Sequence, residues 1–394
     1  MRRFLIVAAS AVALLWTAVP ATPQTESQNE RFAQTVVRQL LNVQGGKVLV
    51  VFGNPEHVTL AEDIATEAFA IGANAVVTLA SNRMNKMYYQ KVPSRYDSLP
   101  PTGGLRVLGI ADDIVSIDLP FDPSVVAGVP ASRIAAVSKA GNAFTSETLK
   151  RSIPTVSIGN GILPSAANAR QYGVSERVLS DVFWSGLNTN YSQLSRDVNA
   201  VAAAIQGARV RVTARNGTDL SFTAGSSPAE TNDGIVSAAD RSKGGTAVQK
   251  QLPAGDVYFR PQEGTTNGTL VFGDARFNGV VVSGLTLHMS AGRVTSQTVR
   301  TGSSEFERMY GAGGAGRDQL AFFDIGSNRS MHVPAAGQWG PGPSMAAGYV
   351  TIGIGNDLFL GGSNGSAFAF SSNVPNATVT VNGKTIVSNG TLRL

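Results

Sequence analysis

The strongest constraint on the fold is a strand–helix–strand pattern at residues 47–79. Lys47–Phe52 is a continuous apolar run that ends at Gly53, which is typical of a strand buried on both faces of a parallel sheet. Asn54 and Pro55 then supply an expected helix cap and first helical residue. The buried stripe of this helix is expected at Leu60, Ile64, Ala68 and Ile71. A second strand is expected at Ala75–Leu79, so the pattern indicates a βαβ unit.

Further apolar segments extend this alternation to about residue 205. Strands are expected at Leu105–Ile110, Ile114–Leu119 and Ile153–Ile158, and helices at Val174–Trp184 and Ser195–Ile205. We therefore expect residues 25–205 to form an α/β domain with a mainly parallel sheet.

The second half of the chain has a different pattern. Two Asn-Gly pairs, the commonest signal for a two-residue hairpin turn, lie between short strand patterns. They separate Ala208–Ala214 from Asp219–Phe222 and Thr378–Val381 from Thr385–Val387. A helix is expected at Ser303–Tyr310, so residues 206–394 are predicted to form a strand-rich α+β domain. The predicted fold class is thus α/β, with a mainly parallel sheet followed by this strand-rich domain.

The amino terminus has the three parts of a secretory signal. Arg2 and Arg3 precede an apolar run over Phe4–Val19, and small residues follow at Val19-Pro20-Ala21. An uncleaved membrane anchor is the alternative, but the run is short for a span and no basic stop-transfer cluster follows it. We expect residues 1–21 to be a cleaved signal peptide, which predicts a secreted or periplasmic protein without stable membrane insertion.

Composition excludes several classes of site. The chain has no cysteine and only three histidines (His57, His288 and His332), so thiolate metal sites, disulfides and clusters of imidazoles are ruled out or hard to build. The formal charge is +5, and the basic residues are scattered, whereas nucleic-acid binding needs a cluster. Nucleic acid is therefore not an expected partner.

Two glycine-rich motifs are interpreted as loops. Gly311–Gly316 matches the G-x-G-x-x-G pattern, but the residues before it favour a helix, whereas a dinucleotide site needs a strand there. Gly361–Gly365 matches G-x-S-x-G around Ser363, but that arrangement places its histidine after the serine, and the last histidine is His332.

A resemblance to a known family extends over nearly the whole chain after the signal segment. The stretches that carry it, in order, are LNVQGGK (41–47), ARVRVTA (208–214), LPAGDVYF (252–259), NGTL (267–270), IGSN (325–328), IGIG (352–355), GGSNGS (361–366) and VNGKTI (381–386). Together they resemble the aminopeptidase T family, cobalt- or zinc-dependent exopeptidases with an α/β first domain and a strand-rich second domain.

The resemblance also locates the family's metal ligands, which are two glutamates, two histidines and an aspartate. The first glutamate corresponds to Asp256, the second to Phe322, and the first histidine to Thr351. The closing His-x-Asp pair corresponds to Ala369 and Ser371. Because a zinc or cobalt ion needs several anionic or imidazole donors, this replacement predicts that the ancestral metal site is largely lost.

Two hypotheses about function remain open. In the first, the chain is a non-catalytic or repurposed member of the family that binds a peptide or small molecule and needs no cofactor. In the second, it is an active metallo-aminopeptidase that holds zinc or cobalt in a rearranged site. The residues available for that site are Asp256, Glu263, Asp318, Asp324 and His332. Function depends on sites rather than on folds, so the residues favour the first hypothesis. By resemblance, a homodimer is also possible.

Overall fold

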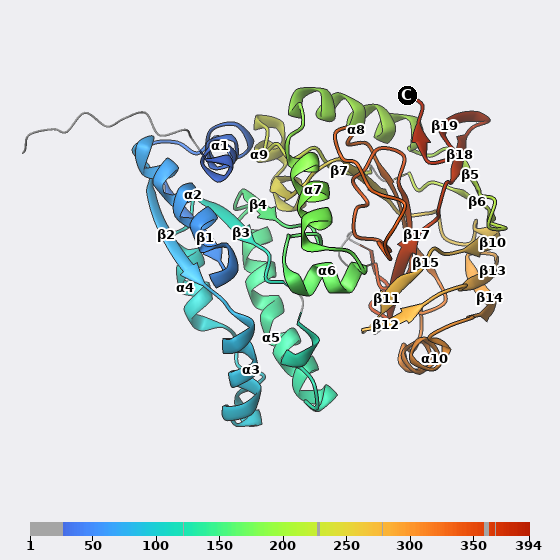
Figure 1. The fold of residues 1–394 in the computed structure, drawn as a ribbon, viewed down its shortest axis with the longest axis horizontal. Helices are drawn as coiled ribbons and strands as arrows, with labels where there is room; N and C mark the ends of the chain where they lie inside the picture. The colour runs from blue at the N-terminus through green and yellow to red at the C-terminus, as the bar shows by residue number, and fades with distance from the viewer. Residues whose placement is uncertain (1–26, 121, 227–228, 278, 358–361, 367) are drawn as a thin grey trace, which may run out of the picture.

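The computed structural model describes residues 27–394 except 121, 227–228, 278, 358–361 and 367. The expected signal peptide, residues 1–21, lies outside the described residues. Figure 1 shows a helix-covered sheet formed mainly by the first half of the chain and, beside it, a strand-rich region formed by the second half. This arrangement confirms the predicted fold class.

The first sheet is parallel throughout and has the strand order β2-β1-β3-β4-β8. Its strands are β1 (Val48–Gly53), β2 (Asn74–Leu79), β3 (Asp113–Ile117), β4 (Thr155–Ile158) and β8 (Gln249–Leu252). Its helices are α1 (Gln28–Gln34), continued by the π-helix η1 (Thr35–Leu40), α2 (Val58–Ala70), α3 (Asn82–Lys91), α4 (Thr102–Ile110), α5 (Ala131–Lys150), α6 (Ala166–Tyr172), α7 (Glu176–Leu187), α8 (Tyr191–Ile205) and α9 (Ala238–Lys243). Short 3₁₀ turns are η2 (Pro55–His57), η3 (Ser94–Tyr96), η4 (Pro123–Val125) and η5 (Gly245–Val248).

The βαβ unit forms as its sequence predicts. The Asn54 side chain accepts hydrogen bonds from the backbone amides of Glu56 and His57, which caps the turn that leads into α2. Leu60 and Ile64 are buried on the inner face of α2, and strands β1 and β2 pair in parallel from Val48 and Asn74 onward. Local capping and apolar spacing therefore determine this part of the fold.

One predicted strand is wrong, because Leu105–Ile110 belongs to helix α4. A short apolar run does not distinguish a buried strand from a helix by periodicity alone. In the structure Leu108 is buried while Ile110 is exposed, so the segment has only a narrow buried stripe. The helix begins at Thr102, directly after Pro100-Pro101.

The parallel sheet takes one strand from beyond residue 205. Strand β8 pairs with β4 from Thr155↔Gln249 to Ile158↔Leu252 and forms the sheet edge. A continuous cluster of buried apolar side chains also runs through both halves of the chain. The two expected domains are therefore joined by a shared sheet and a shared core.

The strand-rich region contains two larger antiparallel sheets. One has the order β14-β13-β10-β6-β5-β18-β19-β20 and includes both predicted Asn-Gly hairpins. Its strands are β5 (Arg209–Thr213), β6 (Asp219–Thr223), β10 (Asn267–Val271), β13 (Thr286–Ser290), β14 (Arg293–Thr298), β18 (Thr378–Val381), β19 (Lys384–Ser388) and β20 (Thr391–Leu392).

The other antiparallel sheet, of order β17-β16-β15-β9-β7, carries the candidate site. Its strands are β7 (Glu230–Asn232), β9 (Asp256–Phe259), β15 (Leu320–Gly326), β16 (Val350–Gly355) and β17 (Ala369–Asn373). A small ribbon of β11 (Ala275–Phe277) and β12 (Val280–Val282) lies nearby, as does helix α10 (Ser303–Ala312).

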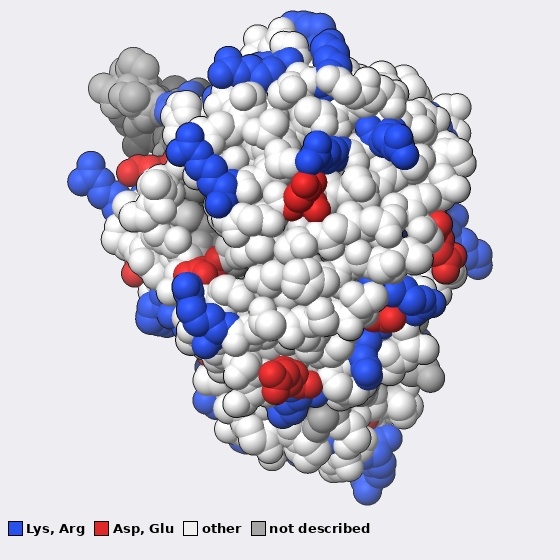
Figure 2. Space-filling view, turned by 90° about the vertical axis from the view of Figure 1, so that its right-hand side faces the viewer, with Lys and Arg blue, Asp and Glu red and all other residues white. Residues whose placement is uncertain are grey.

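The surface and the helices give two further observations. No helix in the described part of the chain is long and apolar enough to cross a membrane. Figure 2 shows Lys and Arg side chains scattered over one face and interleaved with Asp and Glu.

Candidate functional site

The sheet of β9, β15, β16 and β17 has one apolar face and one polar face. Side chains such as Val257, Phe323 and Ile352 point into the core and are fully buried. Residues of the alternate positions face the other way, because successive side chains of a strand point to opposite faces. These alternate residues include Asp256 and Tyr258 on β9, Phe322 and Asp324 on β15, Thr351 on β16, and Ala369 and Ser371 on β17.

A cavity of about 370 Å³ lies over this polar face, and we call it the acid-pair cavity. Its lining residues are Asn160, Gly161, Tyr172, Tyr258, Phe322, Asp324, Pro341, Gly342, Ser344, Thr351, Ile354, Asn356, Ala369, Phe370 and Ser371. Asn160 and Gly161 follow β4 at the carboxyl end of the parallel sheet, where α/β folds commonly bind ligands. The cavity therefore lies between the two sheets.

Asp256 is fully buried beside this cavity and is held by hydrogen bonds. Its Oδ1 accepts from Asn232 Nδ2 at 2.7 Å, and its Oδ2 accepts from the hydroxyls of Tyr258 at 2.5 Å and Ser344 at 3.5 Å. The Asn232 side chain also donates from Nδ2 to the backbone carbonyl of Gln251 of β8 and accepts at Oδ1 from the backbone amide of Gln251, which links this carboxyl to the edge of the parallel sheet.

Asp324 is the second fully buried carboxyl, and among the described residues its oxygens have no hydrogen-bond partner. It lies directly opposite Tyr258 on β9 and Thr351 on β16. Burial raises the pKa of Asp324 well above its usual range, and the nearby charge of Asp256 raises it further. Burial also raises the pKa of Asp256, although the donors from Tyr258 and Asn232 oppose that shift. The pair therefore keeps a proton at pH values where two exposed carboxyls would both be ionised.

Several buried polar atoms at this cavity have no hydrogen-bond partner in the described part of the chain. These atoms are the two carboxyl oxygens of Asp324 and Oγ1 of Thr351. An unsatisfied buried polar group costs about 1–3 kcal/mol, so native proteins rarely retain one without a reason. Because Asp324 and Thr351 both line the cavity, a bound molecule could supply the missing partners.

The Phe322 ring occupies part of the space above the sheet. A Cβ atom on Gly353, which is opposite Phe322 on β16, would overlap this ring. The ring also contacts Tyr258 edge-on, with 5.9 Å between the centroids. Phe322 therefore packs closely onto β16, on a glycine that leaves room for it.

The five positions assigned from the family resemblance converge on this cavity. Phe322, Thr351, Ala369 and Ser371 line it, and Asp256 is bonded to two of its lining residues. Their donor set does not fit a zinc or cobalt centre, because it offers one carboxylate, two hydroxyls and no imidazole. Asp324 adds one more carboxyl. No group of three or more His, Asp or Glu residues within the described ranges could hold a metal ion.

The residues considered for a rearranged metal site are distributed over three places. Asp256 and Asp324 lie together at the acid-pair cavity. Glu263 and Asp318 line a different cavity. His332 is exposed and lines neither of them.

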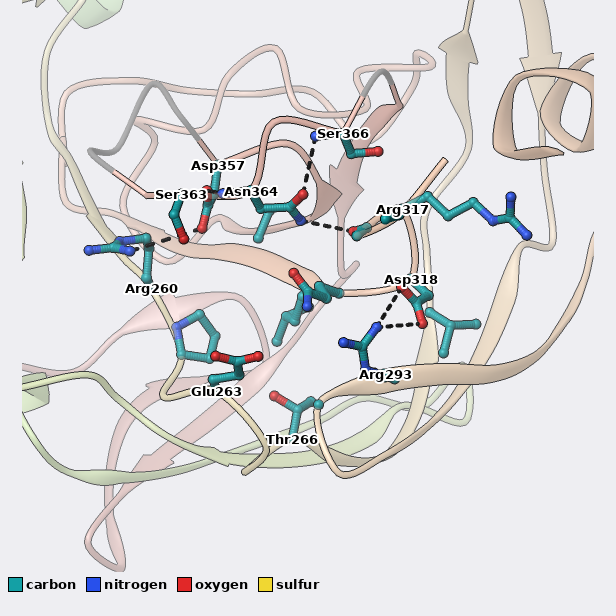
Figure 3. Close-up of a pocket in the computed structure, with 18 of the residues that line it drawn as sticks. Arg260, Glu263, Thr266, Arg293, Arg317, Asp318, Asp357, Ser363, Asn364 and Ser366 are labelled. Atoms are coloured by element: carbon teal, nitrogen blue, oxygen red, sulfur yellow. Dashed lines mark hydrogen bonds and ion pairs between the residues drawn. The ribbon is translucent and has the colours of Figure 1, made fainter. Parts of the chain in front are cut away.

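This second cavity, about 1170 Å³ in volume, is the glycine-loop cavity (Figure 3). Arg293 donates from Nη1 to both oxygens of Asp318 at 3.1 Å, while Arg260 lies beside Asp357 on the other side. Glu263 is exposed in the same cavity. Asp318, named for a metal, is therefore paired with an arginine rather than with an imidazole.

The two glycine-rich motifs meet in the glycine-loop cavity. Asn364 donates from Nδ2 to the carbonyl of Gly316 at 2.8 Å and to that of Gly355 at 2.7 Å. Gly316 has a positive φ of 83° and no room for a side chain next to Asn364. The first two residues of the first motif, Gly311 and Ala312, end helix α10, and the loop predicted for this motif begins only at Gly313. Gly361 of the second motif lies outside the described residues.

Sequence reasoning missed Tyr258, Ser344 and Tyr172 as site residues. Tyr258 could have been found, because the alternating sequence DVYF at 256–259 is compatible with a strand, in which Tyr258 shares the face of Asp256. Ser344 and Tyr172 come from a glycine-rich loop and from the end of α6. No local pattern indicates that these residues reach the same cavity.

Comparison with known proteins gives one family and two similar folds. A sequence model of the family described as thermophilic metalloprotease (M29) matches residues 25–312. This segment contains Asp256 and ends before Phe322. The structure is similar to wild-type AmpT from Thermus thermophilus, with a TM-score of 0.67, 16% sequence identity, and coverage of 93% of this chain and 99% of that one.

A second similar structure is 2,5-dihydroxypyridine dioxygenase from Pseudomonas putida KT2440. The TM-score is 0.62 at 17% identity, with 94% of this chain and 98% of that chain covered. At these identities the likeness concerns the fold. A comparison with curated protein sequences gives no match.

Proposed function

The chain belongs to the thermophilic metalloprotease family M29, and on that premise we propose that it is a divergent member that binds a small ligand without the family's metal centre. The ligand occupies the acid-pair cavity and is a peptide or another small molecule. Export through the amino-terminal signal segment is part of the same proposal.

One observation carries the proposal. The positions that resemble the family's metal ligands surround a single cavity, yet they provide hydrocarbon or hydroxyl groups at four of five places. A divalent ion would remain largely bound by water there, and it could not hold a hydroxide at neutral pH. The cavity itself persists, and binding through hydrogen bonds and apolar contact needs no metal.

The fold similarities support a broader ligand class than peptides. One similar structure is AmpT, and the other is an enzyme named for a small aromatic substrate, 2,5-dihydroxypyridine. The same architecture thus serves more than one kind of molecule.

Metal content and peptidase activity test the proposal together. The purified protein is dialysed against zinc or cobalt and assayed for release of amino acids from chromogenic amides. We expect no ion retained at one per chain and no activity that a chelator removes. As a matched control, Asp256→Ala and Asp219→Ala each remove one carboxyl, the second from an exposed ion pair with Arg211.

The opposite result would favour an active metallo-aminopeptidase. In that case one tightly bound ion per chain would be lost in Asp256→Ala and kept in Asp219→Ala, and activity would follow the ion. His332→Ala and Asp318→Ala would then show whether residues outside the acid-pair cavity contribute.

A further inference from the structure

We propose that the acid-pair cavity takes a compact aromatic ligand, a single ring that carries O–H or N–H donors along one edge. This inference rests on the proposed function, because it specifies the ligand that the cavity binds. It depends on three features of the cavity: unpaired acceptors at one place, aromatic walls that are held in position, and a small volume.

The unpaired acceptors define what one end of the ligand must offer. Asp324 and Thr351 lie opposite each other on β15 and β16, and both line the cavity. The oxygens of the Asp324 carboxyl and Oγ1 of Thr351 have no hydrogen-bond partner among the described residues. A carboxyl that holds one proton still has an oxygen that accepts, so a ligand edge with two donors would bond both Asp324 and Oγ1 of Thr351, and an apolar ligand would leave them unsatisfied.

The aromatic walls define the body of the ligand. Tyr172 is fixed at both ends, since its hydroxyl donates to the carbonyl of Gly161 at 2.8 Å and its ring stacks on Trp339 with centroids 5.4 Å apart. Tyr258 is fixed by its hydrogen bond to Asp256 and by edge contact with Phe322. Rings that are already held in place can receive another ring by stacking or edge contact with little loss of entropy.

The volume limits the size of the ligand. A cavity of about 150 Å³ is enough for benzene, so about 370 Å³ accommodates one substituted ring and a few waters. Small-molecule sites generally range from about 300 to 1000 Å³, which places this cavity near the lower limit. An extended peptide of several residues would not fit within it.

Calorimetric titration with four defined probes tests the inference in buffer that contains a chelator. Resorcinol has an aromatic ring with two hydroxyl donors in the 1,3 positions. The analogue 1,3-dimethoxybenzene keeps the aromatic ring without donors, and cyclohexane-1,3-diol keeps the donors on a ring that is not aromatic. A leucine-containing dipeptide represents the peptide class. We expect saturable binding of resorcinol and binding at least about tenfold weaker for the two matched analogues.

Variants test whether resorcinol binds in the acid-pair cavity. Thr351→Val removes one acceptor at nearly constant volume and should weaken resorcinol about tenfold, while Phe322→Trp should reduce binding by filling the cavity. Thr385→Val, at an exposed position on β19, is the matched control and should bind resorcinol like the parent protein. Circular dichroism and thermal melting verify that each variant is folded, and Thr351→Val carries the test if Phe322→Trp does not fold.

The possible outcomes separate this inference from the proposed function. Equal binding of resorcinol and dimethoxybenzene, or resorcinol binding that Thr351→Val leaves unchanged, would overturn the inference. If only the dipeptide binds and Phe322→Trp prevents it, the proposed function stands and the aromatic ligand class is wrong. If neither the aromatic probes nor the dipeptide binds, both are wrong.

Discussion

Tyr258 shows how a single hydroxyl supports a buried charge. It donates to Asp256 at 2.5 Å, and the carboxyl has no access to water. Hydrogen bonds to charged groups contribute more to stability than those between neutral groups, and removal of one partner leaves the other buried and unsatisfied.

Tyr258→Phe is therefore expected to lower the free energy of unfolding by about 1.5–3 kcal/mol. Tyr349→Phe is the matched control, because the Tyr349 hydroxyl donates to a neutral acceptor, the carbonyl of Gly340 at 2.6 Å. The control should cost less, about 0.5–1.5 kcal/mol. Urea denaturation of the two variants at neutral pH measures the difference, and an equal loss would contradict the argument.

Asp118 provides a prediction about pH. Burial raises the pKa of this carboxyl at the end of β3, despite backbone amides of Gly161 and Asn160 that favour its charged form. Its pKa in the unfolded chain is about 3.9. The folded state therefore binds the proton more tightly than the unfolded chain does. This tighter binding adds to the free energy of unfolding in full at pH values below about 3.9, and the addition is lost as pH rises through the raised pKa.

Asp118→Asn removes this titration, so its free energy of unfolding relative to the parent should increase as pH rises from about 4 toward neutral. Asp219→Asn is the control of opposite sign, because Arg211 lowers the pKa of Asp219 and its contribution is lost as pH falls. Urea denaturation curves from about pH 2 to neutral measure both, because the Asp219 contribution is lost below its unfolded pKa of about 3.9 and that of Asp118 above it. A difference between parent and Asp118→Asn that does not change with pH would exclude the raised pKa.

At the scale of elements, backbone conformation decides where the chain can turn at the end of a strand. Gly159 follows β4 with a φ of 140°, and a Cβ atom there would overlap the Asp118 side chain. Gly103 lies in helix α4 with open space around it and no positive φ. The two glycines therefore respond oppositely to the same substitution.

Gly159→Ala is expected to destabilise the protein by more than about 1 kcal/mol, since the native backbone and the close side chain both resist a Cβ atom. Gly103→Ala should instead stabilise it by up to about 0.5 kcal/mol, because alanine loses less backbone entropy than glycine in the first turn of a helix. Thermal or chemical denaturation of both variants checks the pair. A loss of stability in Gly103→Ala would argue against a helix at 102–110.

For the whole molecule, strand β8 connects the two halves of the chain. It completes the parallel sheet from residues beyond 205, and Asn232 bonds to it from the second sheet. Buried side chains form a cluster that includes residues of both halves. Removal of the second half would expose the β4 edge and part of this core.

A fragment of residues 25–205 is accordingly expected not to fold on its own, whereas the mature chain should unfold in one cooperative transition. Near-ultraviolet circular dichroism of the fragment and calorimetry of the mature chain check this. A fragment with a native-like, cooperative melting transition would show that the first half is independent.

Cleavage of the amino-terminal signal segment is a further prediction about the whole molecule. The secreted product is expected to begin shortly after Ala21, because the segment of residues 1–21 has the order of a cleaved signal peptide. Amino-terminal sequencing of protein recovered outside the cytoplasm measures the cleavage point. A product that still began at Met1 would contradict the prediction.

The sequence by itself determined the βαβ unit, both Asn-Gly hairpins and the types of residue at the family's metal positions. These features depend on interactions between residues a few positions apart, or on composition alone, and no histidine follows His332. The wrong prediction of a strand at Leu105–Ile110 also comes from local sequence, because a short apolar run is compatible with both strand and helix.

The tertiary structure alone decided which side chains share a cavity. The pairing of Asp324 with both Tyr258 and Thr351 is a matter of strand register, and register depends on burial between segments distant in the sequence. Burial then raises the pKa of Asp324 and leaves its oxygens without partners in the described part of the chain. The entry of β8 into the parallel sheet has the same cause, because Gln249–Leu252 has little apolar pattern and is placed by the elements that surround it.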